Sequence, residues 1–214
     1  MLDGRPYKSF ALGIDFLTDN DLPMKTRDRI LATSLTLFNE SGEPNVTTVD
    51  VAHEMDISPG NLYYHFRNKE DIIHALFKQF ETAMADTMEA AATGMLGLGD
   101  YALMLELIFE TQWEYRFFYR DLNHLLGKDA YLKKHFSHLL EKQRKATFQV
   151  LKSYAHHKAI RATLEELNYL VTQILFILTF SMNYQQLLTV LSKEVVITTG
   201  VAQINQLILP YRAA

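Results

Sequence analysis

Apolar residues recur with a helical period along most of this chain. The segments 132–154 and 167–178 place Leu, Ile, Val, Phe and Tyr mostly three or four positions apart, so each series falls on one helix face. No proline occurs between Gly60 and Leu209, and glycines are few there. A β-protein would need many more turn residues than this. The pattern therefore predicts an all-α fold.

Capping residues divide this pattern into helices. Gly42 is a natural residue to follow a helix end, and Ser58 before Pro59 has the order of an N-cap and a first helical residue. Thr163 and Glu166 have the spacing of a capping box. The predicted helices cover 26–41, a segment that begins at 47 or 48, 58–66, 68–92, a segment that begins with a cap at 100 and kinks before 127, 129–156, 163–191 and 192–210.

The second and third of these helices have the layout of a helix-turn-helix. A tight turn over 55–58 joins them, and Ile57 is placed to fill the angle between them. Leu62 and Phe66 share one face of the third helix and are expected to point inward. Such a motif can place its second helix in the major groove of DNA. A plain helical hairpin is the alternative reading of the spacing.

Polar and aromatic residues on the outer face of the third helix suit contact with DNA. The start of a helix offers free N–H groups to phosphate, and a glycine there permits close approach. Asn and Tyr side chains can bond phosphates or meet base edges. The candidate DNA-contacting residues are Thr47, Thr48, Ser58, Pro59, Gly60, Asn61, Tyr63, Tyr64, His65 and Lys69.

The charge of the chain limits this interpretation. The net charge is −4, and residues 24–70 hold five Lys and Arg against seven Asp and Glu. The basic side chains gather before the first helix and after the third, so a DNA interface would be a local patch. Modest affinity at physiological salt is expected.

The sequence around this motif resembles the DNA-binding domain of TetR-family regulators. The resemblance rests on 24–31, 37–42, 46–48 and 57–71, and the run 62–70 is its most diagnostic part. Residues 42–46 and 58–61, and more loosely 180–185, are also similar to a subset typified by PhaD, a regulator of polyhydroxyalkanoate genes. Val49 departs from members that read a base with an arginine at that position.

The resemblance implies a ligand-responsive transcriptional regulator, usually a repressor, that binds a palindromic DNA operator as a homodimer. It implies a helix-turn-helix domain over 24–71 and a helical ligand-binding and dimerisation domain over 72–214, whose last two helices form the dimer interface. The helix over 163–191 is apolar on too many sides for a lone surface helix, which favours the same interface. Complete burial within one subunit is the alternative. Residues 1–23 precede the usual family start and form an upstream extension or an arm that touches DNA.

A ligand cavity is predicted where aromatic residues mix with a few polar ones in the C-terminal half. An apolar or amphipathic effector would fit such walls, for example a fatty acyl group, or an acyl-CoA whose phosphates meet Arg116, Arg120 or Lys128. Ordinary core packing is the alternative for each residue. The predicted lining comprises Met104, Leu105, Ile108, Phe109, Gln112, Trp113, Tyr169, Gln173, Phe176 and Phe180.

Catalytic and metal signals are weak. His135, His138 and Glu141 share a helix face, but a solvated polar stripe explains them better than a metal site. No nucleophile with a base is readable, so neither an enzyme nor a cofactor is expected. The lack of cysteine fits a cytoplasmic protein, and the apolar run 170–180 is too short to span a membrane. The rival functions are a helical protein-binding adaptor and a helical enzyme without DNA binding.

Overall fold

The computed structural model describes residues 24–94, 98–188 and 192–213, with the side chains of 90–94 and 98–100 left aside. Nearly all described residues are helical, and apart from one bridge between Ile160 and Arg212 they form no β-structure. This confirms the predicted all-α class. The extension over 1–23 lies outside the described residues. The elements are α1 (Thr26–Ser41), η1 (Glu43–Asn45), α2 (Thr48–Glu54), α3 (Pro59–His65), α4 (Lys69–Gly94), α5 (Leu98–Glu114), α6 (Arg116–Arg120), α7 (Leu122–Lys128), α8 (Ala130–His156), α9 (Leu164–Leu188), α10 (Lys193–Ile208) and η2 (Leu209–Tyr211).

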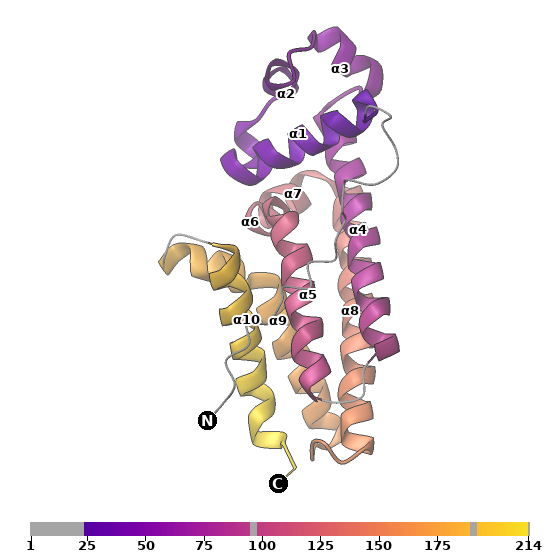
Figure 1. Ribbon diagram of the computed structural model, residues 1–214, viewed down its shortest axis with the longest axis vertical. Coiled ribbons are helices and arrows are strands. Elements are labelled where there is room, and N and C mark those ends of the chain that lie inside the picture. The colour runs from indigo at the N-terminus through magenta and orange to yellow at the C-terminus, as the bar shows by residue number, and fades with distance from the viewer. Residues whose placement is uncertain (1–23, 95–97, 189–191, 214) are drawn as a thin grey trace, which may run out of the picture.

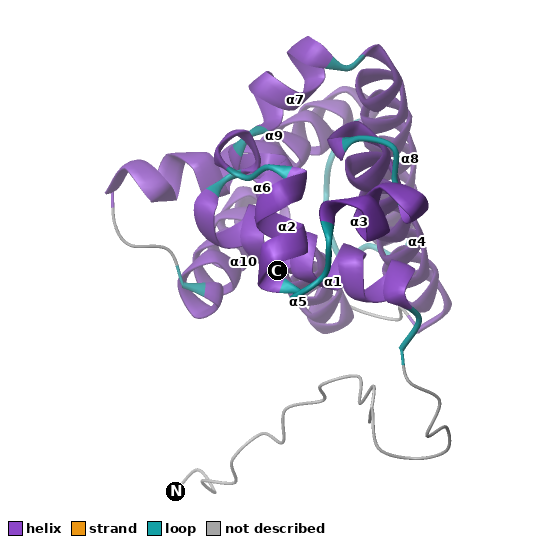
Figure 2. Cartoon of the chain, turned by 90° about the horizontal axis from the view of Figure 1, so that it is seen from above, coloured by secondary structure: helices purple, strands orange, loops and turns teal. Residues whose placement is uncertain are grey.

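The helices form a head and an elongated body. The head comprises α1, α2 and α3, and it occupies one end of the long axis (Figure 1). The body comprises α4 to α10, and α4 runs from the head along the body, where it packs against α5 and α8. Seen down the long axis, α10 lies on the side opposite α4 and α8 (Figure 2). The body therefore has one flank formed by α4 and α8 and another formed by α10 and the neighbouring α9.

Local caps start several helices where the sequence predicts them. The Thr47 side chain accepts a hydrogen bond from the Asp50 amide and closes a capping box, and the Ser58 hydroxyl accepts from the Asn61 amide. The helix starts capped by Asn68, Asp129, Thr163 and Ser192 are likewise confirmed. These bonds satisfy N–H groups that the first turn of a helix leaves without partners.

The segment after α4 differs from the prediction. The helix there begins at Leu98, so Asp100 lies in its first turn and does not cap it. The predicted kink before residue 127 is confirmed as two breaks in the helix, at Tyr115 and Asp121, and Gly127 itself lies inside α7. Between the breaks, three consecutive aromatic residues, 117–119, are all buried. Because consecutive residues point to different sides of a helix, α6 must be enclosed from several directions, and the two breaks permit this.

Close packing of α10 on α5 depends on Gly200. A Cβ at this position would overlap the ring of Phe109, which is fully buried. We expect Gly200→Ala to lower the free energy of unfolding by about 1–3 kcal/mol, because the added methyl group overpacks this crossing. Denaturant unfolding would measure the change. Gly127→Ala is the matched control, since a Cβ there meets nothing within 4 Å and should leave stability unchanged or slightly raised. Equal stability of the two variants would contradict the expectation.

A membrane-spanning helix is not found among the residues that the structure describes.

Candidate nucleic-acid interface

The core of the head holds α2 and α3 at a fixed angle. Leu62 and Phe66 of α3 are buried as predicted, and Ile57 is half-buried in the turn between the two helices. Asp56 in this turn has a φ of 54°, the left-handed region that Asp tolerates better than branched residues do. The inward face of α3 is therefore committed to packing, and its outer face is left to solvent.

The outer face of α3 is open. Gly60 and Asn61 are exposed, and the exposed fractions of Tyr63 and Tyr64 are 46% and 85%. His65 is half-buried. A Cβ built on Gly60 would meet only the Ser58 hydroxyl oxygen, at 3.9 Å. The fold itself therefore does not require glycine at this position, which leaves an external partner as a reason for its small size.

The two threonines before and at the start of α2 are used within the head. The Thr47 hydroxyl donates to Asp50 Oδ2 over 2.7 Å, and hydrogen bonds from Thr47 hold the pKa of Asp50 below its usual value. The Thr48 hydroxyl lies 3.0 Å from the Tyr63 hydroxyl, so it links α2 to α3. Val49 is exposed beside them. The structure thus brings the predicted residues of α2 and α3 onto one surface.

Lys69 departs from its predicted role. Its ammonium donates to the carbonyls of Glu43 and Val46, each over 2.8 Å, and pairs with Glu43 Oε1 at 2.7 Å. An ammonium group has three N–H donors, so all of them have partners inside the protein. The Glu43 carboxylate is itself buried. The direct phosphate contact predicted for Lys69 is therefore replaced by an internal one, through which Lys69 fixes the loop before α2.

The end of α1 is held by a side chain of the body. The Arg120 guanidinium donates to the carbonyls of Phe38 and Asn39, which lie in the last turn of α1. A cation there adds donors to carbonyls at the helix end, although the Phe38 carbonyl also accepts from the Gly42 amide, and it opposes the negative end of the helix dipole. Asp121 Oδ2 accepts a hydrogen bond from the Glu43 amide over 2.9 Å. The loop after α1 is thus also tied to the body, by the residue that follows Arg120.

Asn39 completes this connection from the head. Its amide nitrogen donates to the Glu114 carbonyl over 2.8 Å, and its amide oxygen accepts from the Phe117 amide over 3.1 Å. Both bonds satisfy backbone groups at the break between α5 and α6. We call Asn39, Arg120 and Asp121 the head–body clamp. No sequence signal identified it, because its partners lie far apart along the chain.

The ten predicted cavity residues do not share one cavity. Leu105 and Phe109 belong to the core, and Gln112 is buried, where it hydrogen-bonds Tyr119. Trp113 lies under the Arg116 guanidinium, 4.6 Å from the ring centroid. Tyr169, Gln173, Phe176 and Phe180 are exposed on α9. The ten residues therefore do not line one cavity, because the apolar residues of α9 face in more than one direction.

Met104 and Ile108 do line a cavity, which lies inside the body between α4, α5, α8 and α9. Its volume is about 140 Å³. Gln143, Thr147 and Gln149 are the polar members of its lining, and the described residues around it include no charged side chain. The remaining lining residues are Met88, Ala146, Val150 and Leu178.

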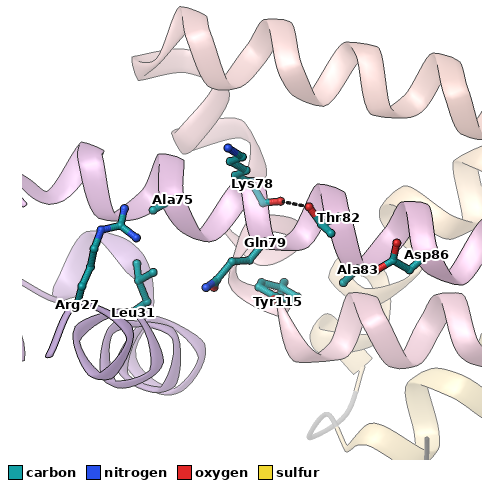
Figure 3. Close-up of a pocket in the computed structure, with 9 residues that line it drawn as sticks. All are labelled: Arg27, Leu31, Ala75, Lys78, Gln79, Thr82, Ala83, Asp86 and Tyr115. Carbon is teal, nitrogen blue, oxygen red and sulfur yellow. Dashed lines mark hydrogen bonds between the residues drawn. The ribbon is translucent and has the colours of Figure 1, made fainter. Parts of the chain in front are cut away.

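A second hollow lies where the head meets the body (Figure 3). Its walls carry Arg27 of α1 and Lys78 and Asp86 of α4, all exposed, and Tyr115 closes one side. The Arg27 guanidinium also lies 4.7 Å from the centroid of the Phe66 ring. This groove is polar and charged, so it suits an apolar ligand less well than the cavity inside the body. Its other lining residues are Leu31, Ala75, Gln79, Thr82 and Ala83.

One flank of the body presents a row of exposed apolar side chains. Tyr169, Phe176, Phe180, Tyr184 and Leu187 recur at helical spacing along α9, and their exposed fractions range from 40% to 84%. We call this row the α9 face. A hollow of about 680 Å³ between α9 and α10 adjoins it. Exposed apolar patches of this kind mark interaction sites.

The apolar residues of α10 mostly face the other way. Val196, Val201, Ile204 and Ile208 are buried within the subunit. Helix α10 packs against α5 and α9 of its own chain. Burial within the subunit therefore accounts for much of the apolar surface of the last helix. The outer side of the pair is carried chiefly by the aromatic residues of α9.

The histidines over 135–138 do not gather into a metal site. His135 Nδ1 lies 3.6 Å from Glu81 Oε2, and Glu141 pairs with Arg144 instead, which lowers the pKa of Glu141 to about 2. No cluster of three potential metal ligands occurs among the residues that the structure describes.

The buried side of α3, the tight turn and the open outer face define a helix-turn-helix protein. A family model described as "Bacterial regulatory proteins, tetR family" matches residues 30–76, and another described as "Bacterial transcriptional repressor" matches residues 79–214. The chain therefore belongs to the TetR family.

A solved TetR-family transcriptional regulator from Marinobacter aquaeolei VT8 is 33% identical, with a TM-score of 0.81 over 89% of this chain and 92% of that one. The probable regulator YttP of Bacillus subtilis is 24% identical over 89 residues, which are 42% of this chain. The biofilm operon regulator IcaR of Staphylococcus epidermidis is 39% identical over 46 residues, 22% of this chain. The matched stretches span only 43% of YttP and 25% of IcaR. These relatives and neighbours are named as transcriptional regulators, not as enzymes.

Proposed function

We propose that this protein is a cytoplasmic transcriptional regulator that binds a palindromic DNA operator as a homodimer and releases it when an effector binds. The observation that carries the proposal is the outer face of α3, where Gly60, Asn61, Tyr63 and Tyr64 are presented to solvent on a helix fixed from behind. The relative IcaR is a negative transcriptional regulator, which supports action as a repressor.

The electrostatics of the head support a local DNA contact. Lys25, Arg27, Arg29 and Arg67 are exposed, whereas Glu43 is buried and paired with Lys69. One of the acidic charges counted against DNA binding is thus neutralised inside the head. We propose contacts from Thr47, Thr48, Ser58, Pro59, Gly60, Asn61, Tyr63, Tyr64 and His65, with Lys69 in a positioning role.

The proposed organisation keeps the predicted units, with a DNA-binding domain over 24–71 and a ligand-binding and dimerisation domain over 72–214. The α4 helix leads from one to the other and could carry a movement between them. The finer likeness to the PhaD subset, and an arm within 1–23, remain part of this proposal.

Selection from a pool of random duplexes with the full chain would test the proposal. We expect a palindrome whose half-sites lie about one helical turn apart, roughly 34–36 Å, or a multiple of it, because two subunits related by two-fold symmetry present two copies of α3. Affinity for the selected duplex should fall steeply as salt is raised. Recovery of no preferred sequence at low salt would reject DNA binding as the function.

A second copy of the chain is the proposed occupant of the α9 face. The face is continuous with a hollow between α9 and α10, and an isologous contact would cover its aromatic row in both subunits at once. Phe176→Glu should therefore yield monomers in sedimentation, because it places a charge in a dry interface. Leu103→Glu is the control, since Leu103 is similarly exposed but lies on α5. If Phe176→Glu stayed dimeric, the second copy would have to sit elsewhere.

A further inference from the structure

We propose that the effector held by the cavity inside the body is a compact, uncharged and mostly apolar molecule that accepts one hydrogen bond from the Gln143 side chain. This inference rests on the proposed function only in taking the cavity as the effector site. It goes further in stating which chemistry the cavity selects.

The side chain of Gln143 carries the hydrogen-bonding part of the proposal. Gln143 lies on α8, is 4% exposed and lines the cavity. Among the residues that the structure describes, its amide nitrogen has no hydrogen-bond partner. A buried polar group without a partner costs free energy, and such groups in folded proteins are nearly always satisfied by something. A ligand atom that accepts a hydrogen bond would remove this cost.

The walls of the cavity set the remaining properties of the ligand. Met88, Met104, Ile108, Val150 and Leu178 supply an apolar surface. Thr147, which is also buried, adds one hydroxyl. Because no described lining residue is charged, an anionic or cationic ligand would be desolvated without a counter-charge, which is very unfavourable. Neutral molecules are therefore strongly favoured.

The two arginines of α6 do not change this conclusion. Arg120 is engaged by the carbonyls of Phe38 and Asn39 in the head–body clamp. Arg116 is stacked on Trp113 and donates to the Trp113 carbonyl over 3.2 Å. Neither residue lines the cavity. A carboxylate or phosphate inside the cavity would thus have no cationic partner among the described lining residues.

The size of the cavity favours a small ligand. Its volume of about 140 Å³ is close to that of an engineered apolar cavity of roughly 150 Å³ that binds benzene. Two of the walls are methionines, whose unbranched side chains adapt to different shapes. A single ring with one short substituent is the size that fits without moving a helix.

Three probes of nearly equal shape test the proposal on the full chain. Acetophenone carries a carbonyl acceptor, α-methylstyrene replaces that oxygen by a methylene group, and benzoate replaces the acetyl group by a carboxylate. We expect acetophenone to bind about tenfold more tightly than α-methylstyrene, which corresponds to about 1.4 kcal/mol. Benzoate should bind at least tenfold more weakly than acetophenone. Calorimetry or ligand-observed NMR would measure the three affinities.

Two glutamine variants locate the hydrogen bond. Gln143→Met keeps the length of the side chain and removes its amide, so the preference for acetophenone over α-methylstyrene should fall to within twofold. Gln149→Met is the matched control, because Gln149 lines the same cavity but is exposed to solvent. It should keep the tenfold preference. Gln143→Met should also unfold at an equal or higher temperature than the parent, since it removes an unpaired buried amide.

Several results would overturn the proposal. These are benzoate binding as tightly as acetophenone, no binding of acetophenone up to its solubility limit, or an unchanged preference in Gln143→Met. The comparison of probes on the parent chain needs no variant to fold. DNA binding by the full chain, measured without probes, separates the proposed function from this inference. If the chain binds no DNA but prefers acetophenone, the proposed function alone is rejected. If it binds DNA but shows no preference among the probes, this inference alone is rejected.

Discussion

Replacing Gly60 by alanine is expected to weaken operator binding at least tenfold while the protein stays folded. The added methyl group would meet only the Ser58 hydroxyl inside the protein, so the head has room for it. In the proposed complex the same methyl group would lie between the start of α3 and the DNA backbone, where close approach is needed. Alanine also favours a helix over glycine by up to about 1 kcal/mol, so stability should not fall. Fluorescence anisotropy with the selected duplex and denaturant unfolding would give both values.

Gly127→Ala is the control for this prediction. It adds the same methyl group to another helix, at a position with nothing within 4 Å, and it lies outside the head. It should leave the affinity for DNA unchanged. If Gly60→Ala bound the duplex as tightly as the parent chain, the N-terminal end of α3 could not lie against DNA, and the assigned contact surface would be wrong.

Arg120→Met should loosen the attachment of the head to the body. The variant removes the donors that hold the Phe38 and Asn39 carbonyls, which leaves the end of α1 without its cation. Hydrogen bonds to charged groups contribute about 1.5–3 kcal/mol, so we expect the free energy of unfolding to fall by about that amount. We also expect hydrogen exchange to rise more in α1–α3 than in α8, because the head loses one of its ties to the body and keeps those of Asn39 and Asp121.

Arg116→Met separates this effect from the simple loss of an arginine. Arg116 is the first residue of α6, but its guanidinium bonds the Trp113 carbonyl within the same part of the body. Arg116 has only a charge interaction with Glu40 of α1, so its removal should raise exchange in the head much less. Equal exchange profiles for the Arg120→Met and Arg116→Met variants would show that Arg120 does not join the head to the body.

The parts of the fold that the sequence predicts well are those set by neighbouring residues. The starts of α2 and α3 follow from Thr47 and Ser58, whose side chains bond amides three residues later. The inward face of α3 follows from the spacing of Leu62 and Phe66. In each case the structure depends on a local hydrogen bond or on the spacing of apolar residues, and both can be read from a short stretch of sequence.

The parts that could not be predicted depend on distant partners. Nothing near Lys69 shows that a buried Glu43 will take its charge, and nothing near Arg120 shows that it meets the end of α1. The ligand cavity fails for a related reason. Because α9 is apolar on several sides, its pattern does not distinguish Leu178, which faces the cavity, from Phe176, which faces outward.

The close contact between Gly200 and Phe109 determines how a movement of α5 on ligand binding would affect α10. Ile108, which borders the cavity, is the neighbour of Phe109 in α5. Because Gly200 has no side chain, the Phe109 ring packs directly against the backbone of α10, and no flexible side chain lies between the two helices. A ligand larger than the cavity would displace α5, and this movement would pass directly to α10 and from there to α9, the helix whose exposed face is the proposed contact with a second copy.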